Sequence, residues 1–183
     1  MVKKIGILAI HGDVAEHAAI LRKLKFAVIE VRAKKDFAKL DGLILPGGES
    51  TTIGKLAEKF GLISEIKKIA ARGKIIFGTC AGLILLAKFG LLNVEVARNA
   101  YGRQLDSFET ELSIPEIGKK KIPVAFIRAP KILKVGAGVE ILAKFEDVPI
   151  FVRERNIFAA SFHPEILGES EIHEFIFRSK IRA

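Results

Sequence analysis

Apolar and polar positions follow two different periods along the first half of the chain. Short runs of mainly apolar residues cover 4–10, 27–33, 42–48 and 74–80, and helical periodicity marks residues 13–26, 52–73 and 81–89. Apolar strands separated by helices are typical of a parallel sheet that is covered on both faces. The first half therefore predicts a doubly wound α/β fold, in which helices flank a mostly parallel sheet.

The second half of the chain is richer in strands. Strand patterns cover residues 91–98, 107–114, 122–130, 139–146, 149–155 and 157–163, and a helical pattern follows at 171–181. Their connections are short. We find no internal repeat, low-complexity segment or linker that would divide the sequence. We therefore expect a single domain over residues 1–183, with extra strands in its second half.

Composition narrows the classes of function. The formal net charge is +9, but Lys and Arg are spread along the chain, so we expect no nucleic-acid partner. No apolar run reaches the length that spans a bilayer, and the first residues lead directly into a strand, so we expect neither a membrane partner nor a signal peptide. One cysteine cannot form an internal disulfide, which favours a reducing compartment, the cytoplasm.

That cysteine, Cys80, lies where a strand pattern changes to a helix pattern. It is the centre of the stretch GTCAG, residues 78–82, a thiol counterpart of the nucleophile elbow in which two glycines make room for a sharp turn. At a helix N-terminus the helix dipole favours a thiolate, and the amide of Ala81 can donate to an oxyanion. Cys80 is therefore a candidate nucleophile, and a small core thiol is the alternative.

Among the histidines, only His163 has a companion carboxylate close by in the sequence. It belongs to SFHPE, residues 161–165, and the residue before a proline favours an extended conformation. Side chains two residues apart then share a face, so Glu165 can orient the imidazole, although an exposed turn would look similar. His11 could line the same cleft, whereas His17 and His173 fall in helical patterns and are expected to be surface or core residues.

A third strand-to-helix junction is GLILPGGESTT, residues 42–52. Gly47 and Gly48 offer backbone N–H groups without side chains, and Ser50 or Thr51 can cap the helix that follows. Such a turn can hold an anion and supply a second oxyanion donor beside Cys80, although many Pro-Gly-Gly turns have no function.

The class I, triad-type glutamine amidotransferases carry PGGES, GTCAG and FHPE in this order, and this chain resembles them. The resemblance implies a flavodoxin-like fold. Within the class, the chain is similar to the glutaminase subunits of pyridoxal phosphate synthases, on PGGEST, FGTCAGLILLAK, GLLNVEVARNAYGRQLDSFE, FIRAP and SFHPE. The resemblance implies hydrolysis of L-glutamine to glutamate and ammonia, and a synthase subunit as the partner that receives the ammonia. This chemistry needs no cofactor, and no cysteine or histidine cluster has the spacing of a metal site.

The same resemblance implies roles for individual residues. Cys80 would be the nucleophile that forms a glutamyl thioester, with His163 and Glu165 as its relay. The oxyanion would rest on backbone amides near Gly48 and Ala81. A guanidinium suits the α-carboxylate of glutamine, and the implied substrate-binding positions are Gly48, Glu49, Ser50, Arg98, Ile127 and Arg128.

Three other interpretations share part of this pattern. The glutaminase half of an imidazole glycerol phosphate synthase would share Cys80, His163 and Glu165 but would lack the block ARNAYGRQLDSFE. A regulatory subunit with a vestigial triad and a cysteine peptidase on the same fold are the others. Activity on free glutamine separates these possibilities.

Overall fold

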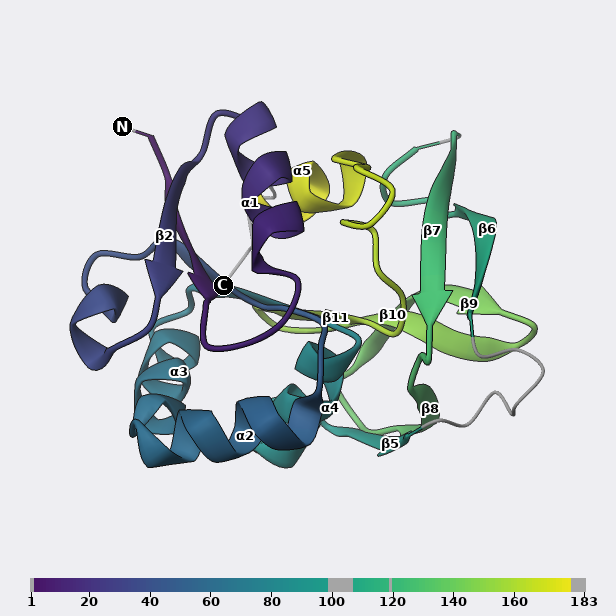
Figure 1. Ribbon diagram of the computed structural model, residues 1–183. Helices are drawn as coiled ribbons and strands as arrows, with labels where there is room; N and C mark the ends of the chain where they lie inside the picture. The colour runs from purple at the N-terminus through teal and green to yellow at the C-terminus, as the bar shows by residue number, and fades with distance from the viewer. Residues whose placement is uncertain (1, 99–106, 119, 179–183) are drawn as a thin grey trace.

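A seven-stranded sheet lies at the centre of the computed structural model, which describes residues 2–98, 107–118 and 120–178. Figure 1 shows how the helices and strands are arranged. The strand order of the sheet is β2-β1-β3-β4-β11-β10-β9. The parallel strands are β1 (Lys4–Leu8), β2 (Ala27–Val31), β3 (Gly42–Leu45), β4 (Ile75–Thr79) and β11 (Ile157–Ala160). Two antiparallel strands, β10 (Val148–Glu154) and β9 (Glu140–Phe145), extend one edge. The predicted mostly parallel sheet is confirmed.

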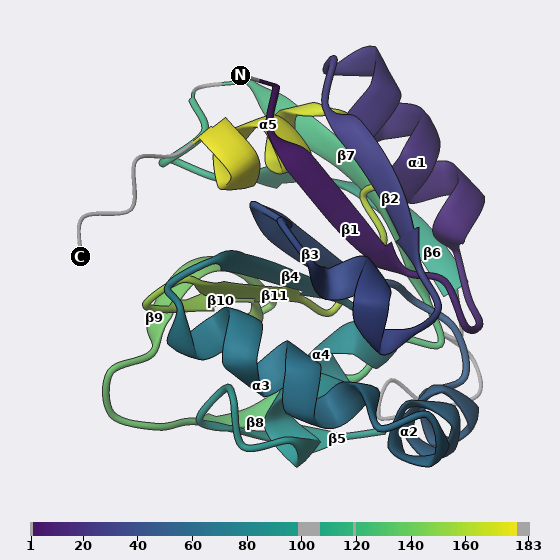
Figure 2. The same ribbon diagram turned by 90° about the vertical axis from the view of Figure 1, so that its left-hand side faces the viewer.

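Helices cover both faces of this sheet (Figures 1 and 2). One face carries α1 (Val14–Lys23) and α5 (Glu171–Arg178), and the other carries α2 (Ser50–Lys59), α3 (Leu62–Ala71) and α4 (Ala81–Lys88). Each face has its own core, and the strands supply both. In β3, for example, Ile44 packs into the core under α1 and α5, while Leu43 and Leu45 pack into the other. Burial on both faces explains why the central strands β3, β4 and β11 carry no charged residue.

Two small antiparallel ribbons form the extra strands of the second half. Strand β6 (Ser107–Ser113) pairs with β7 (Lys121–Ile127), and β5 (Val94–Ala97) pairs with β8 (Lys131–Val135). Strand β7 also reaches the segment after β11, because the amide of His163 donates to the carbonyl of Ala125 at 2.7 Å. The β6–β7 ribbon thereby fixes the backbone of one candidate catalytic residue.

One local prediction was wrong, and two elements were missed. The helix predicted over residues 52–73 is two helices, because the chain turns between α2 and α3 at Gly61, which has φ of +65°. Strand β8 and a 3-10 helix at Lys34–Phe37 were not predicted. Residues 99–106 of the ARNAYGRQLDSFE block lie outside the described residues. No helix in the described ranges is both long enough and apolar enough to cross a bilayer.

Candidate active site

Cys80 forms a sharp turn between β4 and α4. Its backbone has φ of 47° and ψ of −98°, a conformation that is strained for a residue with a side chain. Gly78 and Gly82 are required because there is no room for a side chain at either position. A Cβ on Gly78 would lie 2.7 Å from the backbone of Gly82, and a Cβ on Gly82 would lie 2.1 Å from the carbonyl oxygen of Leu45. The elbow therefore depends on close contact between β4, α4 and β3.

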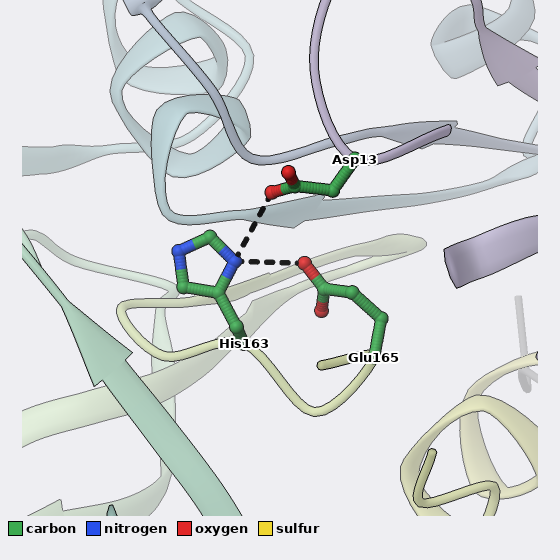
Figure 3. A group of neighbouring side chains, drawn as sticks. All are labelled: Asp13, His163 and Glu165. Carbon is green, nitrogen blue, oxygen red and sulfur yellow. Dashed lines mark hydrogen bonds and ion pairs between the residues drawn. The ribbon is translucent and has the colours of Figure 1, made fainter. Parts of the chain in front are cut away.

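His163 and Glu165 follow β11 and contact each other side by side. The Nδ1 atom of His163 lies 2.8 Å from Oε1 of Glu165 (Figure 3). Both side chains are buried, and His163 lines the same cavity as Cys80, whose thiol lies 3.9 Å from the carbonyl oxygen of Ile127. The structure thus brings the three residues of the predicted triad together, with Cys80 and His163 at one cavity and Glu165 bonded to the imidazole.

Asp13 is a second carboxylate at the same imidazole, and the sequence analysis missed it. Its Oδ2 lies 3.4 Å from Nδ1 of His163 (Figure 3), and its amide donates to the carbonyl of Gly47 at 3.2 Å. A Cβ on Gly47 would clash with both side chains. Asp13 lies between β1 and α1, at the carboxyl edge of the sheet, and this position was the signal by which the sequence could have identified it. His11, which was considered for this place, is exposed and does not line the cavity.

The charges around His163 favour its protonated form. Burial lowers the pKa of His163, but hydrogen bonds with Asp13, Cys80 and Glu165 outweigh burial and raise the pKa to about 12. Burial is also the main cause that raises the pKa of the Glu165 carboxyl, against the hydrogen bond from His163. An imidazolium between two carboxylates can donate a proton to a leaving group, which is what acyl transfer requires.

The turn at Gly48 leads into α2, and Glu49 caps that helix. The carboxylate of Glu49 accepts from the amides of Thr51 and Thr52 at 2.9 and 2.6 Å. These contacts, with the hydroxyl of Thr52 first, lower the pKa of Glu49 to about 2. The prediction that Ser50 or Thr51 caps the helix was therefore wrong.

Arg98 lies over this helix start. Its guanidinium donates to the hydroxyl of Ser50 and, at 3.0 Å, to that of Thr51, and it lies 3.5 Å from Oε1 of Glu49. The other arginine, Arg128, follows β7 with φ of 43°, a strained left-handed conformation. Strain of this kind at a cavity wall is typical of a functional position.

A cavity of about 350 Å³ brings most of these residues together. All sequence-predicted site residues line it except Glu165, which is buried beside His163, and Ala81, whose side chain is buried. The cavity also contains four residues that were not predicted, Asp13, Ile84, Pro130 and Ile166. Its size and its two guanidinium groups suit one amino acid that carries a carboxylate.

One group in the described part of the chain has the arrangement of potential metal ligands. Atoms of Asp13, His163 and Glu165 lie within 4.8 Å of one another. Because Nδ1 of His163 already faces Oε1 of Glu165 at 2.8 Å, we interpret the group as a network of ion pairs.

The fold is that of the class I glutamine amidotransferases. A crystal structure described as a glutamine amidotransferase superposes with a TM-score of 0.91 at 42% identity, over 95% of this chain and 97% of that one. The structure of PurLQS from Thermotoga maritima, at 21% identity and a TM-score of 0.74, shares the fold alone. Residues 7–181 match the model of the SNO glutamine amidotransferase family, and the chain belongs to this family.

Two bacterial relatives show which members of the family this chain is similar to. The pyridoxal 5'-phosphate synthase subunit PdxT of Pseudothermotoga lettingae is 48% identical over 181 residues, which cover 93% of this chain and 92% of the relative. The protein of the same name in Carboxydothermus hydrogenoformans is 42% identical, over 94% and 95%. The resemblance seen in the sequence is confirmed at the level of the family.

Proposed function

We propose that this chain is the glutaminase subunit of a pyridoxal 5'-phosphate synthase, which hydrolyses L-glutamine to L-glutamate and ammonia. Family membership and the named relatives support the reaction class. The observation that carries the proposal is the connection of Cys80, His163 and Glu165 at a cavity of amino-acid size. Residues 1–183 act as one glutaminase domain in this proposal.

In the proposed mechanism, the thiolate of Cys80 attacks the side-chain carbonyl carbon of glutamine. The oxyanion is held by the backbone amides of Gly48 and Ala81. The C–N bond breaks, His163 gives its proton to the departing ammonia, and a glutamyl thioester remains. His163 then removes a proton from water, which attacks the thioester and releases glutamate and the thiol. Neither step calls on a cofactor or a metal ion.

The proposed substrate-binding residues divide according to the group of glutamine that each would hold. Arg98 and Arg128 supply guanidinium groups for the α-carboxylate, and Glu49 offers negative charge for the α-ammonium. Gly48, Ser50 and Ile127 complete the binding surface. Arg98 already contacts Ser50 and Glu49, so substrate competes with contacts inside the protein.

The proposed partner is the synthase subunit that consumes the ammonia. Neither a nucleic acid nor a membrane has a part in this proposal, and the single cysteine agrees with a reducing, cytoplasmic location. A glutaminase subunit of another amidotransferase would use the same three residues with a different acceptor, and a regulatory subunit would have no activity.

The experiment is glutamate release from L-glutamine by the purified chain, with and without a pyridoxal 5'-phosphate synthase subunit. We expect release that increases with the synthase and disappears in Cys80→Ala, whose folding is checked by its melting temperature. A rate of glutamate release that is the same with and without the synthase would contradict the proposal that the synthase is the partner. Absence of release under both conditions would contradict the glutaminase assignment and favour the regulatory subunit.

A further inference from the structure

Two buried histidines that the proposed mechanism does not use lie in a chain of contacts that ends at Glu165. His17, on α1, and His173, on α5, are both fully buried. Nδ1 of His17 lies 2.9 Å from Nε2 of His173. Nε2 of His17 lies 3.2 Å from the hydroxyl of Thr79 and 3.4 Å from Oε1 of Glu165. The contacts join residues that are up to 156 positions apart in the sequence.

Thr79 is the central member of this network. It is the last residue of β4, directly before Cys80, and it is fully buried. Its hydroxyl donates to Oε1 of Glu165 at 3.3 Å. The same oxygen of Glu165 accepts from Nδ1 of His163 at 2.8 Å. Thr79 therefore links the strand that carries the nucleophile to the carboxylate that orients His163.

The direction of each hydrogen bond follows from the carboxylate. An ionised carboxylate can only accept, so the single hydroxyl proton of Thr79 points to Glu165. The hydroxyl oxygen of Thr79 must then accept from Nε2–H of His17. A neutral His17 has no proton left for Nδ1, so Nε2–H of His173 must donate to that atom. Both histidines therefore carry their proton on Nε2, and every donor in the chain points towards Glu165.

Both histidines are suited to this fixed, neutral role. Burial is the main cause that lowers the pKa of His17 well below its ordinary value, and the nearby His173 and His163 lower it further. Burial lowers the pKa of His173 to about 3, against a smaller opposite effect of the Glu169 backbone. Because neither ring takes up a proton in the neutral range, the direction of the hydrogen bonds does not change there.

We propose that His17, supported by His173 and acting through Thr79, is a positioning residue that holds the Glu165 carboxylate in the orientation that aligns His163 with Cys80. Without the donor from His17, the hydroxyl of Thr79 is free to rotate, and Oε1 of Glu165 loses donors that fix its direction. The nucleophile strand and the base would then be held together less closely. The part of this inference that is tested by enzyme activity rests on the proposed function.

Two pairs of matched variants test this inference. His17→Met fills nearly the same space as His17→Gln, but only Gln keeps an N–H group near the position of Nε2. Thr79→Val has the shape of threonine without the hydroxyl, and Thr79→Ser keeps the hydroxyl. For Met and Val we expect kcat of glutamate release, with the synthase present, to fall about 10- to 100-fold, with little change in KM. Gln and Ser should restore kcat to within about threefold of the parent protein.

Equal loss of kcat in His17→Met and His17→Gln would show that the ring only fills space, and would overturn the proposal. The double variant His17→Met/Thr79→Val gives a second criterion. Because both residues act through one hydrogen bond, we expect the double variant to lose no more than the worse single variant. If the fold-loss of kcat in the double variant equals the product of the fold-losses in the two single variants, the proposal is also overturned.

A readout without glutamine separates this inference from the proposed function. Cys80 is the chain's single cysteine, so the rate of alkylation by iodoacetamide at neutral pH reports on one thiol. We expect slower alkylation in His17→Met and Thr79→Val and recovery in His17→Gln and Thr79→Ser, even if the protein releases no glutamate. ¹⁵N spectra of histidine-labelled protein should show His17 with its proton on Nε2, and a proton on Nδ1 would contradict the chain of donors.

Discussion

Asp13 and Glu165 approach the same nitrogen of His163, at 3.4 and 2.8 Å, and this arrangement sets the electrostatics of the site. Glu165 is fully buried, whereas the Asp13 side chain is 30% exposed and lines the cavity. The two carboxylates therefore have different parts to play. Glu165 contacts the ring from the protein interior, while Asp13 adds negative charge on the side of the ring that faces the cavity.

The first prediction concerns Asp13→Asn. Removal of this carboxylate takes away a contact that raises the pKa of His163, so we expect that pKa to fall. The measurement is the pH titration of the imidazole resonance of His163 by NMR. Asp147→Asn, at an exposed turn, is the control and should leave the titration unchanged. An unaltered His163 titration in Asp13→Asn would show that Asp13 has no electrostatic effect on the ring.

At this scale, prediction from sequence succeeded where the pattern was local. Cys80 lies between two glycines, and His163 and Glu165 are two residues apart, so each could be found in a short stretch. Asp13, His17 and His173 could not be assigned, because their contacts join segments that are far apart in the sequence and meet only in the folded sheet.

At the scale of elements, the elbow depends on how closely α4 approaches β3. Gly82 is in the first turn of α4. In a helix, alanine is normally more favourable than glycine by about 1 kcal/mol. A Cβ there would lie 2.1 Å from the backbone oxygen of Leu45, which cannot move without a shift of β3. Forced overpacking of this kind costs about 1–3 kcal/mol or more, so the clash outweighs the gain in helix propensity.

We therefore predict that Gly82→Ala lowers the free energy of unfolding and reduces glutamate release. Gly73→Ala is the matched control, because a Cβ there has no atom within 4 Å and its cost comes from φ of +70° alone, about 1 kcal/mol. Urea unfolding of both variants gives the comparison. If Gly82→Ala is as stable as Gly73→Ala, the packing argument for the elbow is wrong.

Helices and strands were predicted well where apolar residues had a clear period. The break between α2 and α3 was missed, because apolar residues continue with helical spacing on both sides of Gly61. Strand β8 was missed because it has only five residues and two of them, Lys131 and Lys134, are lysines. It is stabilised by pairing with β5, which local sequence does not reveal.

For the whole molecule, the buried histidines His17 and His173 make stability depend on pH on the acidic side of neutral. The pKa of His173 falls from 6.5 when unfolded to about 3 when folded, and that of His17 is also lowered. Between these values the unfolded chain binds protons that the folded protein does not. The contribution of each of these two residues to stability is therefore fully present above pH 6.5 and is lost as pH falls below that value, towards pH 3 for His173, by up to about 1.4 kcal/mol per pH unit for each histidine.

His173→Gln tests this dependence, because glutamine does not titrate and can keep a donor towards His17. We expect the free energy of unfolding of the variant to fall less steeply between pH 6.5 and 3 than that of the parent protein. Urea unfolding at several pH values measures both slopes. Identical slopes would mean that His173 titrates normally in the folded protein.

In the proposed mechanism, Cys80 carries out the chemistry by forming a bond to the substrate carbon. The most direct measurement is covalent labelling by an electrophilic diazoketone analogue of L-glutamine, followed by peptide mass spectrometry. We predict a single label on Cys80, loss of glutamate release in step with labelling, protection by L-glutamine, and no label in Cys80→Ser. Glutamate release that survives complete labelling of Cys80, or that persists in Cys80→Ser, would contradict the account.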